Sequence, residues 1–257
     1  MGSLDLSVVV PIFNEEEGIL IFTDELRKNL ETLNLSYEVL YINDGSSDAT
    51  QVKIESIDWA NLKHYEFQTN LGHMRALEAG MDLALGEMIL TIDADLQHPP
   101  KYISEFIKTK NEQNVEVVYG VRDSRTEDGL LKRISAKFYY FLMKKLSGVN
   151  IRENAADFRL ITKNVNEVLK SITDQNKIYR LLIPSLNFSE AQIIFKAEKR
   201  LVGKTKYSFT TKEGRTVDVF VETSTGKRNT AMKLGKILNP TEGGSMNIRK
   251  GRLIFAM

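Results

Sequence analysis

The chain has 257 residues, of which 42 % are hydrophobic, so it is long and apolar enough for one α/β domain or for one domain with an appendage. Its 35 basic residues nearly balance its 34 acidic residues, and the net charge of +1 argues against nucleic-acid binding as its main activity. Cysteine is absent, which excludes disulfide bonds and thiolate chemistry and fits a reducing compartment.

The sequence carries no sign of membrane insertion. The first residues contain no basic segment followed by a long apolar run, so we expect no secretory signal. No stretch reaches the roughly 18 consecutive apolar residues that indicate a spanning helix. We therefore expect a cytoplasmic protein whose contact with a membrane is peripheral.

Short apolar runs alternate with helical patterns along the first half of the chain. The runs predict strands at residues 6–12, 37–42, 62–67, 88–92 and 115–119. Asn14 is the predicted N-cap of a helix after the first strand, and a further helix is predicted between Gly72 and Leu85. This alternation predicts an α/β fold with a mostly parallel sheet and helices on both faces. In such sheets ligands bind beyond the carboxyl ends of the strands.

Two carboxylates directly follow the fourth predicted strand. Asp93 and Asp95 are separated by one small residue, and Gln97 comes two residues later. Just past a strand end the backbone can turn these side chains toward one point, although successive residues within a strand face opposite ways. Their hard oxygen donors suit Mg²⁺ or Mn²⁺ rather than zinc, which favours imidazole and thiolate ligands. Because Mg²⁺ with few protein ligands usually also binds phosphate oxygens, the pattern indicates a metal-bound diphosphate.

Seven short segments, taken in order and spacing, resemble the family 2 glycosyltransferases of GT-A fold. Four lie in the first half of the chain: VVVPIFNE at 8–15, NDGSSD at 43–48, NLG at 70–72 and DADLQHP at 93–99. Three more, YGVR at 119–122, NAADFRL at 154–160 and RLVGKTKYS at 200–208, resemble the branch that acts on polyprenyl phosphates. The resemblance covers residues 6–210. One such motif is a weak signal, whereas seven in register are a strong one.

The resemblance implies a binding site for a nucleoside diphosphate sugar. Asp44 would bind the base or ribose, and Pro11 and Glu15 would line the same pocket together with Asp93 and Asp95. A carboxylate can accept hydrogen bonds from ribose hydroxyls or a base imide, so the role is chemically reasonable for Asp44. By the same analogy Asp95 is the surest metal ligand, and Asp93 and Gln97 complete the set for Mg²⁺ or Mn²⁺.

On the acceptor side the resemblance implies cations that hold a phosphate. Guanidinium groups suit phosphate because they bind it bidentately, and ammonium serves as a point charge. The predicted set is Arg122, Arg133, Arg200 and Lys206, and Arg200 and Asp95 are also predicted to act in catalysis. Asp157 is the third predicted catalytic residue. It acts either as a base or by orienting the acceptor or Arg159.

The implied activity is metal-dependent, inverting transfer of a hexose from a nucleoside diphosphate sugar to a polyprenyl phosphate such as undecaprenyl phosphate, with UDP-glucose as the favoured donor. A soluble saccharide acceptor is the first alternative, and a non-catalytic nucleotide-sugar sensor is the second. The expected place is the inner face of the cell membrane. Homo-oligomers are possible, and we expect no nucleic-acid partner.

Three features are not explained by the motifs. Residues 130–146 predict a helix rich in aromatic and basic residues, which lies either at a membrane interface or against the sheet or another subunit. His73 and His98 adjoin motifs but have no evident ligand partner, so we predict loop or packing roles for both. The expected domains are a glycosyltransferase domain at 1–210 and a polar, basic tail at 211–257 that is flexible or weakly folded and has no transmembrane helix.

Overall fold

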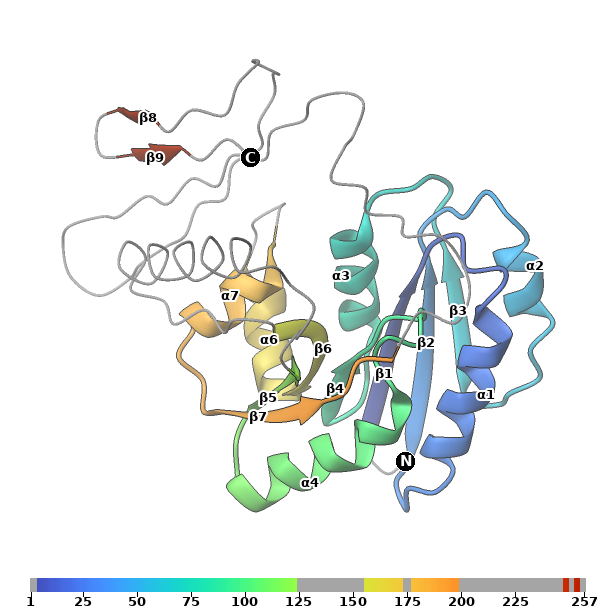
Figure 1. Ribbon diagram of the computed structural model, residues 1–257, viewed down its shortest axis with the longest axis horizontal. Helices are drawn as coiled ribbons and strands as arrows, with labels where there is room; N and C mark the ends of the chain where they lie inside the picture. Colours follow the sequence, from blue (N-terminus) through green and yellow to red (C-terminus); the bar gives the residue numbers. More distant parts are fainter. Residues whose placement is uncertain (1–3, 124–154, 173–176, 199–246, 250–251, 255–257) are drawn as a thin grey trace. The chain divides into compact units, whose positions relative to one another are not determined.

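The computed structural model describes residues 4–123, 155–172, 177–198, 247–249 and 252–254 (Figure 1). These residues divide into two compact units. The larger contains 4–123, 155–172 and 187–198, and the smaller contains 177–186 and the two short segments near the C-terminus. The predicted helix at 130–146 lies outside the described residues, as does most of the predicted tail.

A mixed, seven-stranded sheet forms the larger unit (Figure 1), and its strand order is β3-β2-β1-β4-β6-β5-β7. Neighbouring strands are parallel except where β6 pairs antiparallel with β4 and with β5. The strands are β1 (Leu6–Ile12), β2 (Tyr37–Asn43), β3 (Leu62–Glu66), β4 (Met88–Thr91), β5 (Val117–Arg122), β6 (Ala155–Thr162) and β7 (Glu190–Phe195). All five predicted strands are therefore present, and the predicted α/β class with a mostly parallel sheet is confirmed.

Helices cover both faces of this sheet. They are α1 (Ile19–Leu30), α2 (Thr50–Glu55), α3 (His73–Leu83), the short 3₁₀ helix η1 (Pro100–Tyr102), α4 (Ile103–Gln113) and α6 (Lys163–Ser171). The main core joins alternate β1 residues such as Val8 and Val10 to Phe22 of α1 and Phe106 of α4. Helix α3 lies on the other face, so close that a Cβ at Gly80 would be 2.3 Å from a methyl carbon of Val9.

The first helix begins later than predicted. Asn14 has a left-handed backbone (φ 51°), and α1 starts at Ile19 after Gly18. The Asn14 side-chain oxygen accepts the Ser47 N–H at 2.8 Å, and its own N–H donates to the Ser46 hydroxyl at 2.8 Å. The prediction of Asn14 as an N-cap is wrong because its hydrogen bonds tie the loop after β1 to the loop after β2 instead.

The smaller unit contains α7 (Tyr179–Ser185) and an antiparallel pair of strands, β8 (Asn247–Arg249) and β9 (Arg252–Ile254). Within the part of the chain that the structure describes, no helix is both long enough and apolar enough to cross a bilayer.

Candidate functional site

The polar motifs gather at the carboxyl ends of the parallel strands. Asp44 follows β2, Asp93 follows β4 by two residues, and His73 is the first residue of α3. Strand β6 runs the opposite way, so its first residues lie beside the end of β4, where Thr91 pairs with Arg159. The Thr91 hydroxyl donates to the Asp157 carbonyl at 2.6 Å, which fixes Asp157 beside the loop of Asp93.

His73 lies between the two acidic motifs. Its Nε2 is 3.7 Å from Asp93 Oδ1 and 3.7 Å from Asp157 Oδ2. Burial lowers the pKa of His73, but the nearby carboxylates of Asp157 and Asp93 outweigh it, so the pKa is raised. The two carboxylates therefore share one imidazole, which favours the charged form of that ring.

Asp157 is held by a buried cation. Arg159 donates to Asp157 Oδ1, and its side chain is only 4 % exposed. Such a charge-assisted pair fixes the direction of the carboxylate. The role of Asp157 stays a prediction, and both predicted roles need a carboxylate that is held in place.

His98 and Arg122 form the other half of the site. Arg122 Nη2 is 3.2 Å from Gln97 Oε1 and 3.2 Å from His98 Nε2, while His98 Nδ1 is 3.3 Å from Asp93 Oδ2. Burial raises the pKa of Asp93, but His98 and His73 more than offset it, so the pKa lies below its usual range. Asp93 is thereby ionised and joined to the predicted acceptor cation Arg122 through His98.

Asp44 is buried, with 2 % of its surface exposed. Its Oδ1 accepts the Leu71 N–H at 2.7 Å and its Oδ2 accepts the Gly72 N–H at 2.9 Å. Burial raises its pKa, and these backbone hydrogen bonds only partly counter the effect. The carboxylate therefore orders the turn that leads into α3, and a nucleotide would have to use its remaining lone pairs.

The other predicted donor-side residues, Pro11 and Glu15, lie in and just after β1. Pro11 is buried inside β1, where it pairs with Ile42. Glu15 donates its N–H to the Thr50 hydroxyl at 2.8 Å, which ties the loop after β1 to α2. Three predicted acceptor cations, Arg133, Arg200 and Lys206, lie outside the described residues.

The predicted metal ligands have suitable chemistry but are not arranged as a closed cage. Asp95 Oδ1 accepts the Gln97 N–H at 3.0 Å, and Gln97 Oε1 accepts from Arg122. The described residues contain no group of three His, Cys, Asp or Glu side chains placed to hold an ion. Carboxylates keep further lone pairs after one hydrogen bond, so Asp93 and Asp95 fit a divalent ion whose other ligands come from a diphosphate.

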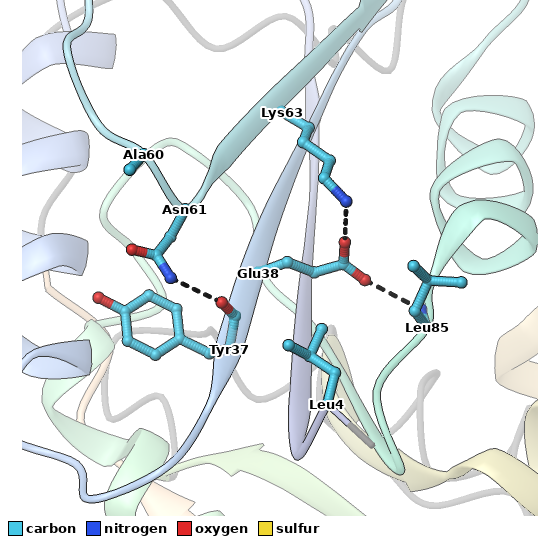
Figure 2. Close-up of a pocket in the computed structure, with 7 residues that line it drawn as sticks. All are labelled: Leu4, Tyr37, Glu38, Ala60, Asn61, Lys63 and Leu85. Atoms are coloured by element: carbon cyan, nitrogen blue, oxygen red, sulfur yellow. Dashed lines mark hydrogen bonds and ion pairs between the residues drawn. The ribbon is translucent and has the colours of Figure 1, made fainter. Parts of the chain in front are cut away.

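A cavity of about 370 Å³ lies at the opposite, amino end of the strands (Figure 2). It is lined by Leu4, Tyr37, Glu38, Ala60, Asn61, Lys63 and Leu85. Glu38 accepts from Lys63 at 2.9 Å and from the Leu85 N–H at 2.9 Å, and Asn61 donates to the Tyr37 carbonyl at 2.8 Å. These polar groups satisfy one another, and none belongs to a predicted site motif.

The two histidines of the site were not among the residues predicted for it. The prediction of loop or packing roles for His73 and His98 is incomplete, because both rings contact site carboxylates. A usable signal was present, since His98 directly follows Gln97 in the fourth motif and His73 directly follows the third. No pattern in the sequence predicts the antiparallel strand β6, which brings Asp157 to His73.

Comparison with known families finds a match over more than half of the chain. The model of the family described as "Glycosyl transferase family 2" matches residues 7–170, a range that includes all the described site residues. The chain belongs to this family. Its mostly parallel sheet with helices is that of the GT-A glycosyltransferases, so the expected fold is confirmed.

Curated relatives of this family 2 chain come from several bacteria and phages. A prophage bactoprenol glucosyl transferase homolog of Escherichia coli is 35 % identical over 207 residues, which cover 80 % of this chain and 67 % of the relative. The bactoprenol glucosyl transferase of Shigella phage SfV is 33 % identical over 80 % of this chain and 67 % of its own. An uncharacterized glycosyltransferase of Bacillus subtilis is 34 % identical over 79 % of this chain but 64 % of its own. The family 2 chain thus spans about two thirds of the length of these relatives.

Solved structures share the fold at much lower identity. Glucosyl-3-phosphoglycerate synthase from Mycobacterium tuberculosis, in complex with Mn²⁺, UDP and phosphoglyceric acid, has a TM-score of 0.57 and 16 % identity. The match covers 78 % of the family 2 chain and 72 % of the synthase. Staphylococcus aureus TarS in complex with UDP-GlcNAc has a TM-score of 0.51 and 16 % identity over 77 % of this chain and 60 % of its own.

Proposed function

We propose that this chain is the glycosyltransferase domain of an enzyme that transfers a hexose from a UDP-sugar, with UDP-glucose as the first candidate, to a polyprenyl phosphate. The observation that carries the proposal is the contact of Asp93 with His98 and of His98 with Arg122, which joins a donor-side carboxylate to an acceptor-side cation. The bactoprenol glucosyl transferases among the relatives support a polyprenyl phosphate acceptor.

The proposed reaction is a single displacement with inversion. A phosphate oxygen of the acceptor attacks the anomeric carbon while the bond to the UDP oxygen breaks, and its electron pair leaves with the diphosphate. The transition state resembles an oxocarbenium ion. Mg²⁺ or Mn²⁺, when bound, would stabilise the charge that grows on the diphosphate, and Asp93, Asp95 and Gln97 are the residues that would hold it.

The protein's own side chains must chiefly overcome repulsion between two anions. Of the predicted acceptor cations, Arg122 lies among the described residues, and guanidinium can bind a phosphate bidentately. Because the acceptor is already anionic, it needs no strong base. We therefore assign Asp157, held by Arg159, to orienting the acceptor or accepting its last proton.

A donor screen tests the proposal. The protein is incubated with Mn²⁺ or Mg²⁺, a short polyprenyl phosphate and one labelled donor at a time: UDP-glucose, UDP-galactose, UDP-N-acetylglucosamine or GDP-mannose. We expect label in the organic extract with UDP-glucose. Label only on a water-soluble saccharide would favour the soluble-acceptor alternative. Tight nucleotide binding without transfer from any donor would favour a sensor.

A further inference from the structure

His98 is a buried ring that packs against two aromatic side chains. Only 1 % of its surface is exposed. Its ring stacks on Phe158 of β6, with centroids 5.4 Å apart and planes 28° apart, and meets Phe195 of β7 edge-on at 5.6 Å and 72°. These neighbours fix the plane of the imidazole, so its two nitrogens point in defined directions.

The contacts of the two nitrogens assign the ring hydrogen. His98 Nε2 lies 3.2 Å from Arg122 Nη2. A guanidinium group can only donate, so Nε2 must accept. An imidazole that accepts at Nε2 carries its hydrogen on Nδ1. That nitrogen lies 3.3 Å from Asp93 Oδ2 and has no well-aligned partner among the described residues. The hydrogen therefore lies on the nitrogen that is near the Asp93 carboxylate.

The resulting chain of contacts runs from Arg122 through His98 to Asp93. One end is the cation assigned to the acceptor phosphate, and the other is a carboxylate assigned to the donor. Arg122 also donates to Gln97 Oε1 at 3.2 Å, so a movement of its guanidinium changes the partners of both Gln97 and His98. If a phosphate draws Arg122 away, His98 Nε2 loses its hydrogen bond. The ring can then shift, and its contact with Asp93 changes.

We propose that His98 is a positioning residue that couples acceptor binding at Arg122 to donor binding at Asp93, with its ring hydrogen held on Nδ1. The inference rests on the proposed function for the identity of the two ligands. It predicts that binding of a prenyl phosphate and of UDP change each other's affinity by the same factor, because coupling between sites is reciprocal.

The ring hydrogen can be observed without any turnover. The chain has three histidines, so ¹⁵N-labelled histidine gives a spectrum that the variants His64→Asn and His73→Asn assign. We expect His98 to show a protonated Nδ1 and an accepting Nε2. A short prenyl phosphate should shift the Nε2 signal, and Arg122→Leu should shift it in the ligand-free protein. A hydrogen on Nε2, or no response of that signal to Arg122→Leu, would overturn the inference.

Two substitutions of His98 each remove one of its two contacts and keep the other. In His98→Asn the amide nitrogen can replace Nδ1, whereas nothing reaches Arg122. In His98→Gln the amide oxygen can replace Nε2 as an acceptor, and the donor to Asp93 is lost. We expect His98→Asn to raise KM for the polyprenyl phosphate about tenfold, and His98→Gln to raise the Kd of UDP with Mn²⁺ about tenfold, as for the loss of one hydrogen bond to a charged group. The other constant should change less than about twofold in each case.

The controls distinguish a coupling role from a structural one. His64→Asn, on the exposed strand β3, should change neither constant. His98→Phe keeps the aromatic packing and should lose the effect of prenyl phosphate on UDP affinity. Equal changes of both constants in both isosteres would mean that His98 only supports the fold. If the wild-type protein makes no lipid-linked sugar, the proposed function fails, while the histidine spectrum and the UDP titrations still decide the role of His98.

Discussion

Asp93 and Asp157, which are 64 positions apart in the sequence, both face Nε2 of His73 at 3.7 Å. The contact depends on β6, whose antiparallel pairing with β4 places Arg159 opposite Thr91. Without that strand the sheet would end at β4, and the second carboxylate would lie elsewhere. The site therefore combines residues that follow the end of a parallel strand with residues at the start of an antiparallel strand.

Replacement of Asp157 by Asn tests its part in the chemistry. The variant keeps the size of the side chain and an oxygen that can accept from Arg159. If Asp157 orients the acceptor or takes its proton, kcat should fall roughly 10²- to 10⁴-fold while the Kd of UDP changes little. Initial rates and calorimetric titration of UDP measure the two effects. Unaltered turnover would remove Asp157 from the mechanism, and a matching loss of thermal stability would point to a structural role.

Removal of divalent metal should stop sugar transfer. We expect EDTA to abolish product and added Mn²⁺ or Mg²⁺ to restore it, because the leaving diphosphate then lacks its counter-charge. The variant Asp95→Asn should need at least about tenfold more metal for half-maximal rate, as a lost ligand lowers metal affinity. Glu112→Gln, on the exposed face of α4, is the matched control. Transfer that persists in EDTA would contradict the assignment of Asp93, Asp95 and Gln97.

Gly45 allows two loops of the site to approach each other closely. A Cβ there would lie 2.5 Å from the Thr69 carbonyl carbon and 2.6 Å from the Asn70 nitrogen, and the φ angle is +64°. Gly72 is also left-handed (φ +97°), but its Cβ would meet nothing within 4 Å. Gly72→Ala should cost roughly 1 kcal/mol of backbone strain, and Gly45→Ala should cost at least about 1 kcal/mol more. Urea unfolding compares the stabilities of the two variants. Equal losses of stability would show that the loops can move apart to make room for a Cβ at Gly45.

The Glu38 cluster predicts an acid limb in the stability curve (Figure 2). Burial raises the pKa of Glu38, but hydrogen bonds from Lys63, Ser7 and the Leu85 N–H outweigh it, so the pKa is lowered from its ordinary value of 4.5. A group with a lowered folded-state pKa stabilises the protein above its unfolded pKa and loses that contribution as pH falls through the folded pKa. The wild type should therefore lose stability as pH falls below about 4.5.

The variant Glu38→Gln isolates this contribution. At neutral pH it should be less stable than the wild type by about 1–3 kcal/mol, because it lacks the charge that Lys63 pairs with. Since glutamine does not titrate, the difference should shrink as pH falls below 4.5. Glu31→Gln, at the exposed end of α1, should stay within about 0.5 kcal/mol of the wild type throughout. A difference for Glu38→Gln that is independent of pH would mean that the carboxylate does not titrate with unfolding.

The sequence by itself determined the strands, the α/β class and the family. Apolar runs of strand length and their spacing depend on local chemistry, so β1 to β5 could be predicted from residues such as Val8, Val10 and Leu90. The aspartates after β2 and β4 could be placed at one edge for the same reason, because parallel strands end together.

Only the tertiary structure decided which of these residues meet. Strand β6 follows a long interval and inserts between β4 and β5, which no local pattern specifies. Its direction brings Asp157 and Arg159 to His73, and its Phe158 helps to enclose His98. Asn14 is a second example: the sequence predicted a helix cap, but in the structure its side chain joins the loop after β1 to the loop after β2. Side-chain partners are chosen by long-range packing, whereas strand and helix preferences are largely local.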